Sequence, residues 1–433
     1  GNVTASRGGS LTILDNNGVF FKPDSHIDAA SLIVSTGELN QSKLIDENIV
    51  ELNNFQVDSK VDIEKDASIS VSDSGLAAFV APTVANNGII TAKMGRVELA
   101  GTGTTTTVDL YGDNLVEFAL DEKSDMALNA QNNGEIDVSG GHGVVHLTTG
   151  ATQDIVDSTV NTAGIIKAST ITQEGGKIIL GGATTREVNI AGNISAQNDE
   201  IDVVSTEEII FKDGSSLNQD KGILNATSQN EVIIETGASL NLGESKVYFN
   251  TEKAVLGDNI DTTGEISGTA KIVNVSSDSA KIQDAIDIAQ DDINTEVKVA
   301  AGSYKEDINI NKSLKLLGAQ HGVSYENRNG QNESNILANS QGITIKSENA
   351  VVDGFAITGT NLGNPVILSD NSNNIVISNN LISNSASGIT ISRGNNITVS
   401  NNKISDITDT NPSRIDSDFQ KGVAILSNNG ATN

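Results

Sequence analysis

The sequence predicts an all-β protein, a right-handed parallel β-helix, on three observations. Segment 373–383 returns at an offset of 22 residues as segment 395–405, with eight of eleven positions identical. Each copy holds β-type runs of four or five residues separated by Asn, Ser and Gly, which leaves no room for a crossover helix. Aromatic residues make up 3% of the chain, as suits a narrow core of Ile, Val, Leu and Ala. A short repeat of this kind is typical of a solenoid whose copies stack ~4.8 Å apart.

Asparagine pairs mark the predicted corners between the runs. Asn tolerates the left-handed backbone of a sharp corner. Within each run apolar residues alternate, so we expect Ile377 and Val399 to stack inside the coil and Val376 to face outward. Because stacked amides form hydrogen-bonded ladders, we assign a structural role to one set of corner residues: Asn374, Asn379, Asn380, Asn396, Asn401 and Asn402.

Charge limits the partners. The chain has 433 residues and a formal net charge of −29, spread along its length. Phosphates and anionic membrane surfaces repel such a chain, so we expect neither nucleic acid nor a membrane as partner. Calcium stays an open alternative for the many carboxylates, although the sequence has no EF-hand loop and no Gly-rich nonapeptide repeat.

Export is favoured by the absence of Cys, which makes the chain tolerant of an oxidising compartment. The N-terminus shows no signal peptide, and no run of 18 apolar residues predicts insertion into a membrane. Because the repeat pattern runs into both ends, we expect a fragment or a processed form, with coils that continue beyond residue 433.

Residues 1–270 form the first predicted domain and repeat a looser motif: Gly, any residue, Ile or Leu, any residue, then a small or apolar residue. We expect Gly to supply the positive φ of a corner, and alternation to bury one face of each strand. An insertion is predicted near 113–133. The motif starts at Gly88, Gly134, Gly164, Gly192, Gly214 and Gly237, with second runs starting at Gly95, Gly143 and Gly176.

Two segments of this domain, 17–21 (NGVFF) and 28–36 (DAASLIVST), resemble the secretion domain of the filamentous-haemagglutinin family of two-partner-secreted exoproteins. Asn16 stands where that family has Pro, and Ser31 where it has Gly. Segments 87–92, 95–100 and 192–196 are similar to the family's later coils, so the resemblance covers about 8–270. It implies a right-handed β-helical exoprotein that an outer-membrane translocator exports.

The second predicted domain, 271–433, begins with a short capping or junction helix near 279–289. Its apolar face would be Ile282, Ala285, Ile286 and Ala289, and Ser277 and Ser279 are candidate N-caps. The segment that follows resembles the opening of the pectate-lyase, pectin-esterase and periplasmic copper-protein families, which implies a second right-handed β-helix with coils of about 22 residues. Segment 324–334 is predicted to leave the coil as a polar loop. The matching positions are Gln283, Ala285, Ile286, Asp287, Ala289, Ala301, Gly302, Tyr304, Glu306 and Gly318.

Several of those families are enzymes, but this sequence lacks their catalytic sequence motifs. It therefore predicts no catalytic residue, cofactor or metal. Asp291 and Asp292 form the one adjacent Asp pair in the second domain, and we interpret them as a solvated turn. Asp353 and Asp370 are the other carboxylates near coil positions, and glycoside hydrolysis would need two carboxylates within ~5–10 Å.

Histidines and sequons carry weaker signals. His142 and His146 would stand ~13 Å apart on a strand, too far for one ion, and we expect His26 and His321 at the surface with them. Arg393 is expected on a solvated corner. Glycosylation is left open for eight sequons, at Asn2, Asn40, Asn193, Asn225, Asn274, Asn311, Asn332 and Asn396.

The sequence therefore favours a secreted or cell-surface bacterial exoprotein that acts as an adhesin or structural stalk, without enzymatic activity. Its partners would be the translocator during export, an unidentified protein or glycan receptor, and further copies of itself. Three alternatives stay open: a self-assembling filament or surface-layer protein, a carbohydrate-active β-helix enzyme, and the stalk of a contact-dependent toxin.

Overall fold

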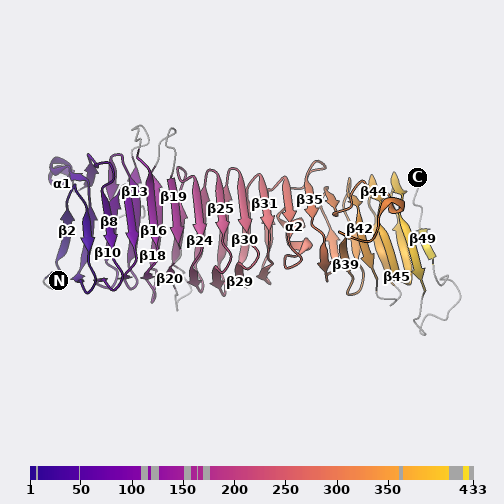
Figure 1. Ribbon diagram of the computed structural model, residues 1–433, viewed down its shortest axis with the longest axis horizontal. Helices are drawn as coiled ribbons and strands as arrows, with labels where there is room; N and C mark the ends of the chain where they lie inside the picture. The colour runs from indigo at the N-terminus through magenta and orange to yellow at the C-terminus, as the bar shows by residue number, and fades with distance from the viewer. Residues whose placement is uncertain are drawn as a thin grey trace. The chain divides into compact units, whose positions relative to one another are not determined.

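Short parallel strands make up most of the regular structure in the computed structural model, which confirms the predicted all-β parallel β-helix (Figure 1). The structure describes residues 1–5, 8–47, 49–108, 116–118, 126–150, 158–162, 164–168, 176–359, 364–408 and 423–428. Contacts divide the chain into two units, Gly1–Asn250 with Asp261–Glu265, and Thr251–Ile260 with Ile266–Asn433. The sequence placed its boundary after residue 270. Two short strands, β32 (Ile260–Thr262) and β33 (Ile266–Gly268), lie in the segment where the division falls.

The first unit has three parallel sheets, called A, B and C, and each coil supplies about one strand to each. Sheet A contains β1 (Asn2–Thr4), β4 (His26–Ala29), β9 (Ser68–Val71), β12 (Ile89–Thr91), β17 (Glu135–Asp137), β20 (Ile165–Ala168), β23 (Asn193–Ala196), β26 (Ser216–Gln219) and β29 (Ser239–Gly243). Sheet B contains β2 (Ser10–Leu14), β5 (Ser31–Ser35), β10 (Leu76–Ala81), β13 (Arg96–Thr102), β18 (Val144–Gly150), β21 (Lys177–Gly181), β24 (Glu200–Ser205), β27 (Ile223–Ser228) and β30 (Lys246–Asn250). Sheet C contains β3 (Val19–Phe21), β8 (Lys60–Ile63), β11 (Thr83–Asn86), β16 (Leu128–Asn132), β19 (Ser158–Thr162), β22 (Glu187–Ile190), β25 (Glu208–Phe211) and β28 (Glu231–Ile234).

Alternation builds the core of this unit. On sheet A, Ile166 pairs with Ile194, which pairs with Leu217, so equivalent residues of successive coils stack in one interior row. These three side chains are at most 1% exposed. Burial of such a side chain contributes about 1.5–3 kcal/mol, and a stack repeats that gain in each coil.

The repeated glycine motif lies on sheet A, and its second runs lie on sheet B. The expected positive φ occurs at Gly214 and Gly237 (77° and 95°). It is wrong for the other motif glycines whose surroundings are described, none of which has a positive φ: Gly88, Gly95, Gly134, Gly143, Gly164 and Gly176. A Cβ at Gly134 would overlap the carbonyl oxygen of Gly88 in the preceding coil, and one at Gly164 would overlap that of Gly134. Close stacking of backbones, rather than backbone handedness, therefore requires glycine there.

Two insertions of the first unit form a small antiparallel sheet, sheet D. Its strands are β6 (Glu38–Leu39), β7 (Val50–Asn53), β14 (Thr106–Val108) and β15 (Val116–Phe118), and helix α1 (Gln41–Glu47) precedes β7. Val50, Leu52 and Val108 of sheet D pack with apolar residues from the outer face of sheet B, among them Ile33 and Val80. This second core was not predicted. Of the insertion predicted at 113–133, segments 113–115 and 119–125 lie outside the described residues.

The strands of the second unit also fall into three parallel sets, called sheets E, F and G here. Sheet E contains β31 (Lys253–Leu256), β34 (Ile272–Val275), β35 (Glu296–Val299), β38 (Lys315–Leu317), β41 (Val351–Asp353), β44 (Ile375–Ser378) and β47 (Ile397–Ser400). Sheet F contains β36 (Gly302–Tyr304), β39 (Ser334–Leu337), β42 (Phe355–Thr358), β45 (Leu381–Ser385) and β48 (Lys403–Ile407). Sheet G contains β37 (Ile308–Ile310), β40 (Ile343–Ile345), β43 (Pro365–Asp370), β46 (Ser387–Ser392) and β49 (Val423–Asn428). Ile377 is fully buried and pairs with Val399, as the sequence predicts.

The predicted junction helix is α2 (Ile282–Ile288), and its four predicted apolar residues are all buried. The serine N-caps were wrong, because the N-cap residue is Lys281 and it makes no side-chain cap. The Glu306 carboxylate instead accepts the N–H groups of Ile282 and Gln283 at 2.8 and 3.0 Å. At the other end, the Lys312 ammonium donates to three helix carbonyls at 2.7–3.1 Å. Both charges complement the helix dipole.

The predicted polar loop does leave the coil, between β38 and β39, and holds one turn of 3₁₀ helix, Tyr325–Asn327. A buried ion pair anchors it. The Arg328 guanidinium, 1% exposed, bonds to Glu333 and donates to the carbonyl of Asn379. A residue from the predicted corner set therefore also fixes this loop.

Candidate functional site

The predicted corner asparagines divide into exposed and buried positions. Asn374, Asn379, Asn396 and Asn401 have positive φ of 52–57°. The Asn396 amide donates to Asn374 at 2.8 Å, and the Asn374 amide donates to Asn349 at 2.9 Å, which makes an exposed ladder across three coils. The Asn379 amide donates to the carboxylate of Asp353 at 2.8 Å.

Asn380 and Asn402 form the buried rung. The Asn380 carbonyl oxygen accepts the N–H of Phe355 at 3.0 Å, and its amide donates to the carbonyl of Val352 at 3.1 Å. The Asn402 side-chain oxygen accepts from both nitrogens of Asn380, at 2.9 and 3.1 Å. These amides are committed to holding adjacent coils together, so the corner set offers little hydrogen-bonding capacity to a ligand.

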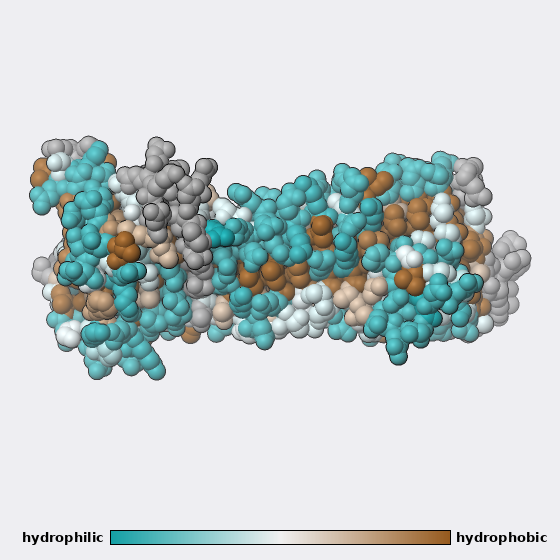
Figure 2. All heavy atoms as spheres, turned by 45° about the horizontal axis from the view of Figure 1, so that its top comes forward, coloured by the Kyte–Doolittle hydropathy of each residue, from teal (hydrophilic) through white to brown (hydrophobic). Residues whose placement is uncertain are grey.

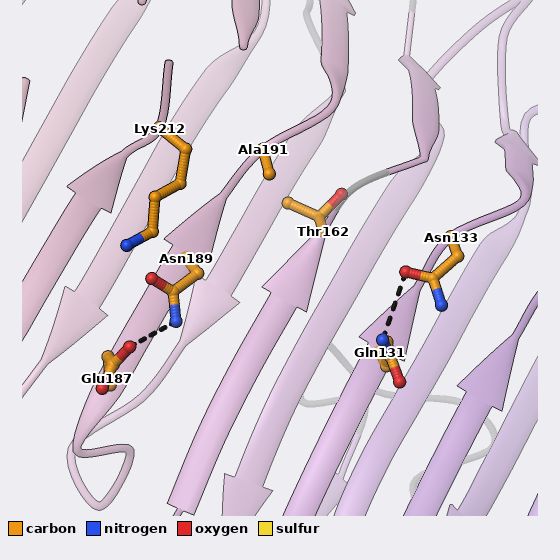
Figure 3. A pocket seen from close by; sticks show the side chains of 7 residues that line it. All are labelled: Gln131, Asn133, Thr162, Glu187, Asn189, Ala191 and Lys212. Carbon is orange, nitrogen blue, oxygen red and sulfur yellow. Dashed lines mark hydrogen bonds between the residues drawn. The ribbon is translucent and has the colours of Figure 1, made fainter. Parts of the chain in front are cut away.

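The strongest candidate for a ligand site is a groove on the outer face of sheet C, called groove 1 (Figure 3). It has a volume of about 440 Å³. Its lining comes from four successive strands or the residues that follow them, β16, β19, β22 and β25, so the groove runs across the coils. The lining residues are Gln131, Asn133, Thr162, Glu187, Asn189, Ala191 and Lys212.

Strand alternation explains why polar side chains gather there. In β16 and β22 the residues beside Gln131, Glu187 and Asn189 are buried, and these three point outward. Gln131 and Asn189 each pair with the β19 residue at position 161, so they lie two coils apart on one row. Ala191 follows β22, and its small side chain leaves space between Thr162 and Asn189 (Figure 3).

Hydrogen bonds orient the lining. The Gln131 amide donates to Asn133 at 3.2 Å, and the Asn189 amide donates to Glu187. The Lys212 ammonium lies 3.6 Å from the Glu235 carboxylate, which offsets its charge. The Thr162 hydroxyl has no hydrogen-bond partner among the described residues although Thr162 is 1% exposed. Thr162 pairs with Asn132 and Ile190, which are both fully buried, so its side chain lies on the interior row and is closed to a ligand in groove 1.

Sequence reasoning missed groove 1, because its residues are distant in sequence and none belongs to a motif. Alternation within β16 and β22 places Gln131, Glu187 and Asn189 outward, and that signal was present. The register that brings these strands together depends on coil lengths that vary in this unit, so the row could not be assembled from the sequence.

The other residues singled out from the sequence are dispersed. Asp353 lies on sheet E and accepts from Gly322 and Asn379, whereas Asp370 lies on sheet G, with the Arg393 guanidinium 3.4 Å away. The structure does not join these two carboxylates in one site. Asp291 and Asp292 lie in the turn after α2 and accept the N–H groups of Ser313 and Asn294.

The histidines also lie apart. His26 hydrogen-bonds to the Ser68 hydroxyl at 2.7 Å, and His321 to the carbonyl of Gly318 at 2.9 Å. His142 is exposed and precedes β18, which contains His146. His146 has an unpredicted partner, because its Nδ1 lies 2.9 Å from the fully buried Glu98 carboxylate. Burial raises the pKa of Glu98, and the neighbouring His146 opposes that rise.

Within the residues that the structure describes, no group of three or more His, Asp or Glu side chains is arranged to hold a metal ion. Neither α-helix in the described ranges is long and apolar enough to cross a membrane. The visible surface is mostly hydrophilic, with scattered apolar side chains (Figure 2).

The chain is similar to a known protein over a small part of its length. No family model matches the chain. A cell surface glycoprotein of Methanothermus fervidus is 34% identical over 122 residues, which are 28% of this chain and 18% of that protein. The chain thus spans less than a fifth of this relative's length. The resemblances to the haemagglutinin and pectate-lyase families stay predictions.

Proposed function

We propose that the chain is part of a cell-surface exoprotein of the adhesin type that binds neutral saccharide chains in groove 1. The observation that carries this proposal is the lining of that groove. Amides, one carboxylate and one ammonium lie along an open trough on stacked strands. Such groups donate to and accept from neighbouring sugar hydroxyls, and a trough across four coils suits a linear chain. A partial relative named as a cell surface glycoprotein supports the location.

Charge favours a neutral ligand. The chain carries a net charge of −29, and the cation that lines groove 1, Lys212, is already beside Glu235. An acidic polysaccharide would meet a repulsive field with no cluster of cations to offset it. We therefore expect neutral chains to bind more tightly than uronic-acid chains.

Binding rather than hydrolysis fits the carboxylates of groove 1. Glycoside hydrolysis uses two carboxylates about 5–10 Å apart, one of them a proton donor. Glu187 is the one carboxylate that lines the groove, and it is held by Asn189. The lining has no aromatic ring on which a sugar could stack, so we expect weak binding, with a Kd on the order of 1 mM.

Export through an outer-membrane translocator, which the haemagglutinin resemblance implies, belongs to the same proposal. Weak saccharide sites suit attachment, because a surface displays many copies and their contacts add together.

The test is binding to linear pentamers of glucose, mannose and N-acetylglucosamine, with a galacturonate pentamer as the acidic comparison. We expect at least one neutral pentamer to bind and Gln131→Ala to weaken it about three- to tenfold, as one hydrogen-bonding side chain does. Asn218→Ala, an exposed amide on sheet A, is the matched control. Failure of every neutral pentamer to bind, or release of reducing ends from any of them, would overturn the proposal.

A further inference from the structure

A second groove, in the other unit, offers most of the chemical groups of groove 1. It is called groove 2 and lies where β34 and β35 begin, with a volume of about 540 Å³. Part of its wall is the connection that leads from α2 to β35. Its lining residues are Lys271, Ile272, Gln290, Asp292, Asn294, Thr295 and Glu296.

The lining of groove 2 shares most of its chemical groups with that of groove 1. Each groove has side-chain amides, one lysine, one glutamate and one threonine, and groove 2 also has an aspartate, Asp292. Thr295, like Thr162, is 1% exposed, so its hydroxyl is closed to a ligand and the parallel rests on the other groups.

Lys271 and Glu296, two of the three charged residues that line groove 2, each lie beside an opposite charge. The Lys271 ammonium lies 2.9 Å from the Glu252 carboxylate, and Glu296 lies 2.8 Å from Lys298 and 3.4 Å from Lys315. The hydrogen bond from Lys298 lowers the pKa of Glu296, so this carboxylate does not suit the role of proton donor in hydrolysis. Asp292 adds a second carboxylate, which accepts the N–H of Asn294, and the side-chain amides are the groups left to recognise a neutral ligand.

Groove 2 also has an apolar surface that groove 1 supplies only through Ala191. Ile272 is 37% exposed at the start of β34 and pairs with Glu296 on β35. The carbon-bearing face of a sugar ring would cover it, while Gln290 and Asn294 bond to the hydroxyls at the ring edge.

A third groove shows what a site without these features looks like. It has a volume of about 260 Å³ and is lined by Ser276 and His321 among others. The Ser276 hydroxyl donates to the carbonyl of Leu256 at 3.1 Å, and His321 is bonded to Gly318. Its lining has one side-chain amide, that of Asn274, and no carboxylate, so the parallel with groove 1 does not extend to it.

We propose that groove 2 is a second binding site for neutral saccharides, which would give the chain two sites of the same ligand class, one in each unit. This inference rests on the function proposed for groove 1, but its test separates the two sites. The chain provides a reporter in each groove: the methyl group of Ala191 in groove 1 and that of Ile272 in groove 2.

The experiment is a titration of the full chain, ¹³C-labelled at Ala and Ile methyl groups, with the neutral pentamers of glucose, mannose and N-acetylglucosamine. Ala191→Gly and Ile272→Val assign the two signals. We expect one of these pentamers to shift both signals with saturating curves. Asn294→Ala should weaken the Ile272 response about three- to tenfold and leave the Ala191 response unchanged.

The other outcomes distinguish the two sites. A shift of Ala191 alone would overturn the second site and leave the proposed function standing. A shift of Ile272 alone would overturn groove 1 and support groove 2, and no shift of either would overturn both. An Ile272 response that Asn294→Ala does not change would place that binding outside groove 2.

Discussion

Beyond residue 95, the described parts of the two units turn their corners with different residues. In the described part of the first unit beyond residue 95, every residue with positive φ is glycine. In the described part of the second unit, eight of the ten non-glycine residues with positive φ are asparagines. Glycine lets adjacent backbones approach, whereas asparagine adopts the same backbone and adds an amide that bonds to the next coil. Both devices occur in both units, since Asn86 bonds to Asn132 in the first and Gly318 closely approaches Gly354 in the second, but amide ladders are more frequent in the second unit.

The largest expected effect comes from the interior, which both units build alike. Ile377→Asp places an unpaired charge at a fully buried position, and we expect a loss of about 4 kcal/mol in the free energy of unfolding. Val376→Asp, whose side chain faces outward from the same strand, should cost far less. Urea unfolding followed by circular dichroism measures both, and equal losses would contradict the inward placement of Ile377.

Gly134→Ala tests the close backbone contact between coils of the first unit. The added Cβ would overlap the Gly88 carbonyl, so we expect a loss of about 3 kcal/mol from forced separation of two coils. Gly214 has φ of 77° but open space around it, and Gly214→Ala should cost about 1 kcal/mol from backbone strain alone. Thermal unfolding distinguishes the two, and a tolerated Gly134→Ala would remove the case for close stacking.

The junction helix gives the second unit a dependence on pH. Burial raises the pKa of Asp284 to about 6, against the opposing hydrogen bond from the Ile260 N–H. Because the folded state favours the protonated acid, this contribution is complete below about pH 4 and is lost as pH rises through 6. It amounts to at most about 3 kcal/mol, and we expect nearer 2 kcal/mol.

Asp284→Asn keeps an oxygen for Ile260 and removes the titration. The variant should therefore be more stable than the parent chain at pH 7 and similar to it at pH 4. Asp261→Asn, at an exposed position, is the control. The reverse order of stabilities at pH 7 would show that the Asp284 carboxylate is stabilised as the anion in the folded state.

Substitutions in the asparagine ladders of the second unit have the smallest expected effect on stability. Asn380→Ala leaves the Phe355 N–H and the Val352 carbonyl without their side-chain partner, and we expect a loss of about 1.5 kcal/mol. Asn396 makes the same kind of ladder on the exposed surface, so Asn396→Ala should cost about 1 kcal/mol or less. Denaturant midpoints would measure the order, which reverses if the exposed ladder is the stronger one.

This contrast explains how much of the fold could be predicted. In the second unit the amide ladders require Asn at equal spacing, and so the repeat of 22 residues is visible in the sequence. In the first unit the recurring pattern is mainly a glycine and two alternating apolar residues. Contact between the backbones of adjacent coils does not require particular side chains at the other positions. Sheet D was missed because its strands lie between coils and pair antiparallel over sheet B.

The site was less predictable than the fold. Groove 1 depends on which coils are neighbours, and the Glu98–His146 pair joins two strands that lie 48 residues apart. The serine caps failed for a similar reason, since the groups that cap α2 come from Glu306 and Lys312, beyond the next strand. Local patterns predict elements, whereas these contacts depend on register.

The most direct test of the functional claim fills groove 1 without removing a hydrogen bond. Ala191 is exposed at the centre of the groove, and Ala191→Tyr would occupy the space between Thr162 and Asn189. The measurement is the affinity of this variant for the neutral pentamer that binds the parent chain, with an unchanged melting temperature as the check on folding. We predict that the groove 1 contribution to binding is lost. Unchanged affinity at every site would contradict the claim that saccharides bind in groove 1.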